Sequence, residues 1–195
     1  MKSEEVISYV SIAVIAISLF FIGTELTGFV TTYNDTAEVN VTIDASAGIS
    51  FSTAILDFGS GAVTPGHSAV LDSNAGTGTY WSGSNTSSQL VLENIGNVNL
   101  TLQLKTNNTA TQFIGGTNPL VQAKVTNKSE EPGACTGTNA FDDYAEINTT
   151  LQTACGGAFA YETAYDQIDI NFKLTIPSNA LGTRTTLITA VGTDA

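Results

Sequence analysis

The chain has 195 residues, with 6 Lys or Arg against 18 Asp or Glu, so its formal net charge is −12 at pH 7. No Lys or Arg occurs between Lys2 and Lys105, and the chain therefore lacks the positive face that nucleic-acid binding requires. Hydrophobic residues make up 42% of the chain, which excludes extended disorder. With a single histidine as well, this composition favours an exported β-rich protein over a cytosolic enzyme.

The N-terminal part contains a long apolar segment. Residues 6–24 carry no charge and are bounded by Glu5 and Glu25. As a helix they would be about 28 Å long, close to the roughly 30 Å hydrocarbon core of a bilayer. We expect a helix over residues 1–30 that anchors the protein in the membrane, and a linker over 31–37. A cleaved signal peptide is the alternative, although no Ala-x-Ala site follows the apolar run.

Glycosylation acceptors are enriched after this segment. Fifteen Asn and 45 Ser or Thr among 195 residues would give roughly 3.5 Asn-x-Ser/Thr triplets by chance, and the chain has seven. The triplets begin at Asn34, Asn40, Asn85, Asn99, Asn107, Asn127 and Asn148. All seven follow the apolar segment, which places the C-terminal part outside the cell.

The two cysteines also indicate export. Cys135 and Cys155 are twenty positions apart, and in an oxidising compartment we expect one disulfide that stabilises the fold by about 3 kcal/mol. Free thiols are the alternative. A metal site would need more sulfur or imidazole ligands than this pair and the distant His67 supply.

Residues 38–195 are predicted to form a sandwich. Alternation of polar and apolar residues predicts strands at 38–46, 49–56, 89–93, 98–105, 120–126, 168–176 and 184–191. Residues 94–97 (Asn-Ile-Gly-Asn) are a turn signal between two of these runs. Small residues dominate 59–83, where we expect a long loop or weak edge strands. The fold class is therefore mainly β: an antiparallel Ig-like β-sandwich of about seven to nine strands, preceded by one long N-terminal α-helix.

Candidate chemistry is scarce. His67 lies in a turn, with no second histidine and no cysteine nucleophile to make a catalytic pair, so we expect no enzyme. Asp142, Asp143 and Glu146 lie between the cysteines, and their carboxylates are a candidate Ca²⁺ site or an acidic solvated loop. No other cofactor is expected.

Two parts of the chain resemble known families. Residues 55–59 (ILDFG), 63–66 (VTPG) and 90–102 (LVLENIGNVNLTL) resemble the β-sandwich domains of archaeal secreted surface proteins. That resemblance implies a strand–Asn-x-Gly-Asn–strand hairpin, and residues 176–189 resemble the terminal hairpin of the same domains.

Residues 3–23 (SEEVISYVSIAVIAISLFFIG) resemble the assembly helix of archaeal type IV pilins and archaellins. In that family a glutamate at the fifth mature position neutralises a neighbour's N-terminal amine, and Glu5 matches this place if Met1 is the mature start. The resemblance implies an assembly face made by Glu5, Val6, Val10, Val14, Ile17 and Phe21.

Three functions follow as expectations. The first is a structural cell-surface glycoprotein, a homo-oligomeric filament subunit that assembles through its N-terminal helix. The alternative is a single-pass anchored ectodomain that binds glycan or another cell-surface ligand through a loop such as 76–88, with Tyr80 and Trp81 either stacking on a sugar or closing one end of the sandwich. The third is a fibre subunit that polymerises by donor-strand exchange, in which residues 38–46 complete a neighbour's sheet edge.

Overall fold

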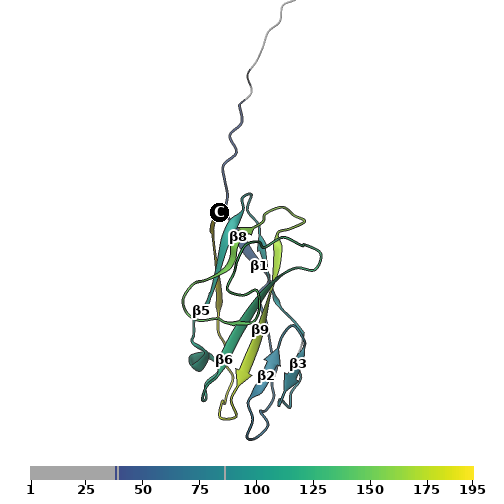
Figure 1. Cartoon of the computed structure of the whole chain (residues 1–195), viewed down its shortest axis with the longest axis vertical. Helices are drawn as coiled ribbons and strands as arrows, with labels where there is room; N and C mark the ends of the chain where they lie inside the picture. The colour runs from purple at the N-terminus through teal and green to yellow at the C-terminus, as the bar shows by residue number, and fades with distance from the viewer. Residues whose placement is uncertain (1–37, 39, 86) are drawn as a thin grey trace, which may run out of the picture. The chain divides into compact units, whose positions relative to one another are not determined.

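The computed structural model describes residues 38, 40–85 and 87–195 (Figure 1). The chain divides into two units, Met1–Thr42 and Ile43–Ala195, and all the strands of the described residues belong to the second. The helix expected over residues 1–30, its membrane segment and the linker over 31–37 lie outside the described residues. Within the described part of the chain, no helix has the length and apolar character needed to cross a membrane.

The larger sheet is built around one long strand, β9. Its seven strands are β1 (Ile49–Thr53), β2 (Ala69–Asp72), β3 (Thr77–Thr79), β4 (Leu90–Asn94), β6 (Leu120–Asn127), β7 (Ala145–Glu146) and β9 (Gln167–Ile176). Along one edge β9 pairs with β6, and along the other it pairs with β4 over its first half and β2 over its second half, all antiparallel. Figure 1 shows β6, β9 and β2 side by side in this order.

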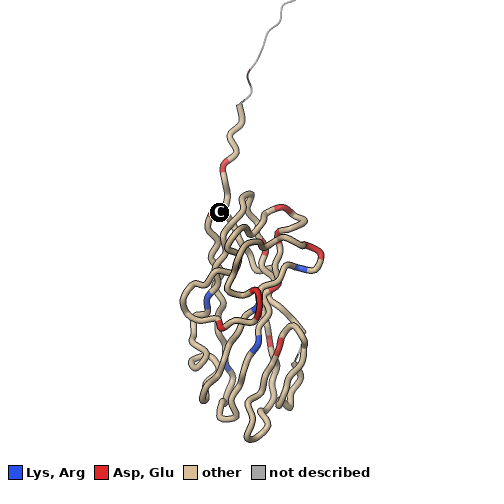
Figure 2. Tube along the Cα trace, viewed as in Figure 1, with Lys and Arg blue, Asp and Glu red and all other residues tan. Residues whose placement is uncertain are grey.

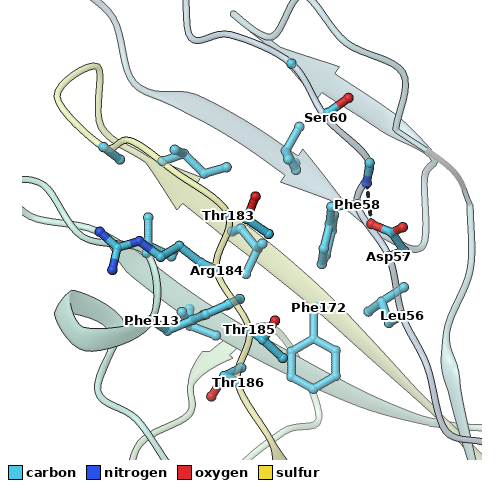
Figure 3. Close-up of a pocket in the computed structure, with 18 of the residues that line it drawn as sticks. Leu56, Asp57, Phe58, Ser60, Phe113, Phe172, Thr183, Arg184, Thr185 and Thr186 are labelled. Carbon is cyan, nitrogen blue, oxygen red and sulfur yellow. Dashed lines mark hydrogen bonds between the residues drawn. The ribbon is translucent and has the colours of Figure 1, made fainter.

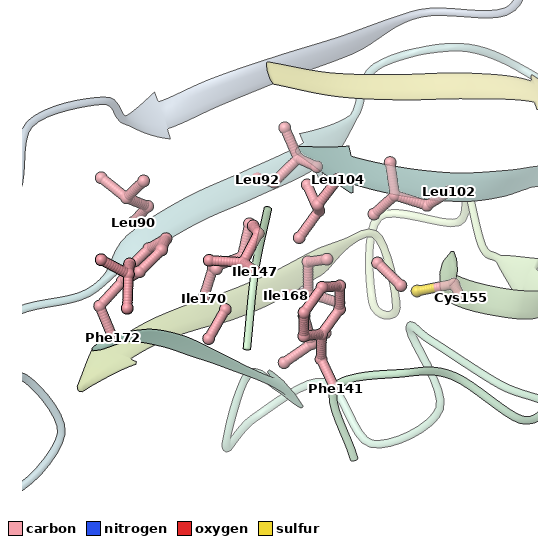
Figure 4. Close-up of a cluster of buried hydrophobic side chains, with 14 of the residues drawn as sticks. Leu90, Leu92, Leu102, Leu104, Phe141, Ile147, Cys155, Ile168, Ile170 and Phe172 are labelled. Carbon is pink, nitrogen blue, oxygen red and sulfur yellow. The ribbon is translucent and has the colours of Figure 1, made fainter. Parts of the chain in front are cut away.

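The smaller sheet has the order β10–β5–β8. Its strands are β5 (Leu100–Thr106), β8 (Gln152–Phe159) and β10 (Ile188–Asp194). Every second residue of β5 is buried, beginning with Leu100, and Leu102 and Leu104 lie against Ile168 of β9 in the core (Figure 4). The structure therefore confirms the mainly antiparallel β class with two sheets, as period-two burial requires.

Two predicted hairpins are wrong. β4 and β5, on either side of the Asn-Ile-Gly-Asn turn, belong to different sheets, and so do β9 and β10. The cause at the first turn is Asn94, which is 1% exposed and whose Nδ2 donates to the carbonyl oxygens of Val98 and Phe159, both at 3.0 Å. This side chain holds the turn between the sheets, so the chain crosses the sandwich instead of folding back on itself.

The prediction of a strand at residues 38–46 is also wrong for the isolated chain: the described residues of this segment lie in no strand. Asn97 holds its C-terminal end, because its Oδ1 accepts from Ser46 N at 2.7 Å and its Nδ2 donates to the Asp44 carbonyl at 3.0 Å. Val41 and Ile43 are each 80% exposed. The alternation is present, but residues 38 and 40–46 are assigned to no strand.

Sequence patterns missed β8 and the short helix α2 (Ala110–Phe113). The β8 sequence, QTACGGAF, has no apolar alternation, and its pairing with β5 is interrupted by register shifts. Helix α2 is a single turn with a capping box made by Thr109 and Gln112. Within residues 59–83, where the sequence predicts a long loop or weak edge strands, two short strands are present: β3 lies at the end of the strand order, whereas β2 pairs with both β3 and β9.

The predicted disulfide is present. Cys135 and Cys155 are bonded, with Cα atoms 5.4 Å apart, and Cys155 is fully buried on β8 opposite Leu102. The bond therefore ties the loop after β6 to the core of the smaller sheet.

Replacing both cysteines (Cys135→Ala with Cys155→Ala) should lower the free energy of unfolding by about 3 kcal/mol, because the unfolded chain loses a 20-residue cross-link. For a unit of this size the melting temperature should fall by roughly 6–12 °C. Thermal unfolding followed by circular dichroism measures this, and wild-type protein with reductant is the control. A melting temperature unchanged in both samples would contradict the assignment.

Candidate functional site

Among the described residues, an apolar groove of about 1160 Å³ lies on the second unit. Two segments that belong to no strand, residues 54–62 and 181–187, border it (Figure 3). The first segment follows β1 and the second precedes β10. Each is therefore attached to a strand, but neither pairs in a sheet. The groove lies where the smaller sheet has ended.

The floor of this groove is the apolar face of the larger sheet. Phe172 and Leu174 of β9 line it together with Val121 of β6, and Phe58 and Phe113 add aromatic surface (Figure 3). Its walls carry apolar side chains that are mostly open to solvent. These are Ile55 and Leu181, each 80% exposed, and Leu187, which is 64% exposed. Large exposed apolar side chains gathered around one concavity are typical of an interaction site.

The groove also contains the only arginine of the chain. Arg184 lies on one wall, and its Nε donates to the Leu181 carbonyl at 3.3 Å. Basic residues are few on this acidic chain, as Figure 2 shows, so the guanidinium is a rare positive charge. Sequence reasoning did not find this site, because its residues come from seven separated stretches of the chain and only folding brings them together.

A second polar feature joins β2, β9 and the segment before β7. The Tyr144 hydroxyl donates to Asp72 Oδ1 at 2.7 Å, and Lys173 Nζ lies 3.4 Å from Asp72 Oδ2 and 3.9 Å from the centre of the Tyr144 ring. Burial alone would raise the pKa of the Asp72 carboxyl. Hydrogen bonds from Tyr144 and from the N–H groups of Ala75 and Asn74, with the charge of Lys173, outweigh burial and lower that pKa below its ordinary value of 3.8.

Asp166 shows the opposite effect. Its side chain is buried, and burial together with the carboxylates of Glu131 and Glu93 raises its pKa above the ordinary value of 3.8. Glu131 Oε2 accepts from the N–H groups of Asp166 at 3.0 Å and Gln167 at 2.7 Å. Folding therefore favours the protonated acid, and the contribution of Asp166 to stability is present below pH 3.8 and lost as the pH rises through its raised pKa.

Of the three carboxylates considered for Ca²⁺, Asp142 and Asp143 have separate partners. Asp143 accepts from the Tyr144 N–H at 2.8 Å and lies 3.6 Å from Lys124 Nζ, whereas Asp142 accepts from Asn139. Glu146 is exposed on β7. Across residues 38, 40–85 and 87–195, no three His, Cys, Asp or Glu side chains are grouped so that they could hold a metal ion.

The adjacent aromatic residues face different surroundings. Tyr80 is 48% exposed and stacks on His67, with ring centres 4.0 Å apart and planes 10° from parallel. Trp81 pairs with Val63 in an isolated bridge and lines the groove. The two rings therefore do not form one flat platform.

Most of the sequon asparagines that the structure describes are exposed. The exposed ones are Asn40, Asn99, Asn107, Asn127 and Asn148. Asn85 differs, because it is half-buried and its Nδ2 donates to the carbonyl oxygens of Asp72 at 2.9 Å and Thr77 at 2.8 Å. Asn34 and the predicted assembly face lie outside the described residues, the latter comprising Glu5, Val6, Val10, Val14, Ile17 and Phe21.

Comparison with known proteins gives no match: no family model fits the chain, and neither a curated protein nor a solved structure is similar to it.

Tyr144→Phe should raise the pKa of Asp72 toward 3.8, because the hydrogen bond that stabilises the carboxylate is lost. In the wild type the contribution of Asp72 to stability is present above pH 3.8 and is lost as the pH falls through its lowered pKa. The variant should therefore unfold about 1 kcal/mol more easily at pH 7 and lose less stability on acidification. Urea unfolding between pH 2 and 7 measures both effects. Tyr161→Phe, at an exposed tyrosine, is the control, and parallel pH curves for Tyr144→Phe and wild type would refute this role.

Glycan mapping should find Asn85 unmodified and sugars on the exposed sequons, among them Asn127 and Asn148. A glycan on Asn85 would replace one of the two N–H bonds that its Nδ2 donates to buried backbone carbonyls. Mass spectrometry of proteolytic peptides from the native protein decides the matter. Full occupancy at Asn85 would show that this asparagine is not held as described.

Proposed function

We propose that this protein is a non-enzymatic structural glycoprotein of the cell surface: a pilin-like filament subunit that assembles through its N-terminal helix and displays a β-sandwich. The observation that carries the proposal is the uncharged stretch over residues 6–24, placed before a disulfide-bonded β unit with exposed sequons. Such a stretch suits a membrane before assembly and a helix bundle after it.

Packing of the helices gives Glu5 a particular role in this proposal. A bundle of many copies would remove Glu5 from water, and an unpaired buried carboxylate costs several kcal/mol. The N-terminal amine of a neighbouring copy is the natural partner, because it supplies the opposite charge at the same depth. A charge of −12 per copy opposes close packing of the sandwiches, so we expect assembly to be favoured by salt.

The anchored-ectodomain alternative is favoured by one observation, the exposed face that Tyr80 presents while stacked on His67. It requires the protein to stay in the membrane fraction as single copies. The experiment on Glu5 therefore distinguishes the two functions as well.

Electron microscopy of sheared cell-surface material should show filaments whose subunit keeps residues 6–24, as N-terminal sequencing checks. Glu5→Gln should reduce filament yield by about tenfold or more, since the neutral amide cannot pair with the neighbouring amine. Glu4→Gln is the matched control and should leave the yield unchanged. Absence of filaments from the wild type, with the protein in the membrane fraction, would overturn the filament function in favour of the anchored ectodomain.

A further inference from the structure

Residues 38–43 have the character of a strand without a sheet. Val39, Val41 and Ile43 alternate with polar residues, and the two of these that the structure describes, Val41 and Ile43, are each 80% exposed. Apolar alternation predicts a strand with one buried face. The described residues of this segment lie in no strand, and the side chains of Val41 and Ile43 stay open to water.

The groove offers room for one more strand between two segments that belong to no sheet. Its two walls, residues 54–62 and 181–187, are not paired in any sheet, and between them lies the apolar floor made by Phe172 and Leu174 (Figure 3). At the end of one wall, Leu187 is held against β5, since its N–H donates to Asn107 Oδ1 at 2.8 Å and its carbonyl accepts from Asn107 N at 3.1 Å. An extended peptide in this groove would lie between two wall segments that belong to no sheet, over apolar side chains.

We propose that residues 38–43 of one copy bind as a β-strand in the groove of a second copy. Six extended residues span about 20 Å, the usual length of a strand. Val41 and Ile43 would cover the floor, and the acidic Glu38 and Asp44 at either end of the segment suit the single arginine of the groove, Arg184. This contact rests on the proposed function in one respect, the assembly of identical copies, and adds to it a bond between sandwiches.

The connectivity favours a second copy over the chain's own segment. Ser46 is held beside Asn97, just beyond the Asn94 end of β4, whereas Leu90 at the opposite end of β4 lines the groove. The chain leaves Ser46 toward residue 43 at the far end of β4 from its own groove. Because donor and acceptor are different surfaces of each copy, the contact repeats head to tail and forms an open chain.

Disulfide trapping in the full-length protein tests the contact. Val41→Cys is combined in turn with Thr183→Cys, Thr185→Cys and Leu187→Cys, three alternate positions along one wall that together cover the unknown register. Both native cysteines of the described structure are already bonded to each other. After mild oxidation, at least one pair should give a ladder of covalent dimers and larger multimers on a non-reducing gel. Val41→Cys with Leu151→Cys, at an exposed leucine outside the groove, is the control and should stay monomeric.

The remaining outcomes overturn the proposal. An internally linked monomer without a ladder would mean that the chain's own segment fills the groove, and no cross-link in any of the three pairs would mean that the groove takes a different occupant or none. Ile43→Asp and Leu187→Asp should each reduce multimer yield by about tenfold, because a charge would be buried on the floor or wall, while Leu151→Asp should not.

The outcome for this contact is separable from the outcome for the helix. Filaments that depend on Glu5 but resist Ile43→Asp and show no ladder would leave the proposed function standing and remove the strand contact. A ladder from protein that forms no surface filaments would do the reverse.

Discussion

The apolar face of β9 is the constraint on which the rest of this structure depends. Ile168, Ile170 and Phe172 project from it into one continuous core, and β4, β2 and β6 are all held in register by its backbone. Figure 4 shows Leu102 and Leu104 of the smaller sheet over the Ile168 end and Leu90 beside Phe172 at the other. Strand β9 is ten residues long and extends beyond the part of the larger sheet that the smaller sheet covers. The groove lies over this uncovered end of β9.

The groove and the open segment at residues 38–43 have one cause in common. In both places an apolar surface that could be covered by a neighbouring strand has no such strand among the described residues. An apolar floor that only loops border leaves exposed side chains such as Leu187, and an alternating segment with no neighbour leaves Ile43 exposed. Each surface alone is a liability in water, because unpaired strand positions invite association. In the proposed assembly, the same two surfaces join one copy of the protein to the next. The high negative charge then limits association to matched contacts, since unmatched surfaces repel.

A disulfide and buried polar side chains stabilise the second unit. The Cys135–Cys155 bond closes the loop after β6 onto the smaller sheet, and Asn94 anchors the crossing between sheets by bonding two carbonyls. Buried polar groups of this kind are costly unless they are satisfied, so they hold one arrangement of the chain against its alternatives. Tyr144, Asp72 and Lys173 do the same between elements distant in sequence.

The sequence by itself determined the mainly antiparallel β class, the disulfide and most strands with clear alternation, such as 120–126 and 168–176. These strands could be predicted because neighbouring residues alternate between polar and apolar side chains with a period of two. The sequence did not determine which strands share a sheet. The hairpins expected around Asn94 and after Ile176 are crossings between sheets, and at the first of them Asn94 bonds Phe159, 65 positions away. Only the tertiary structure decided that the described residues of 38–46 lie in no strand and that a groove opens over Phe172, because both depend on which strands the folded chain brings together, and no local pattern encodes this.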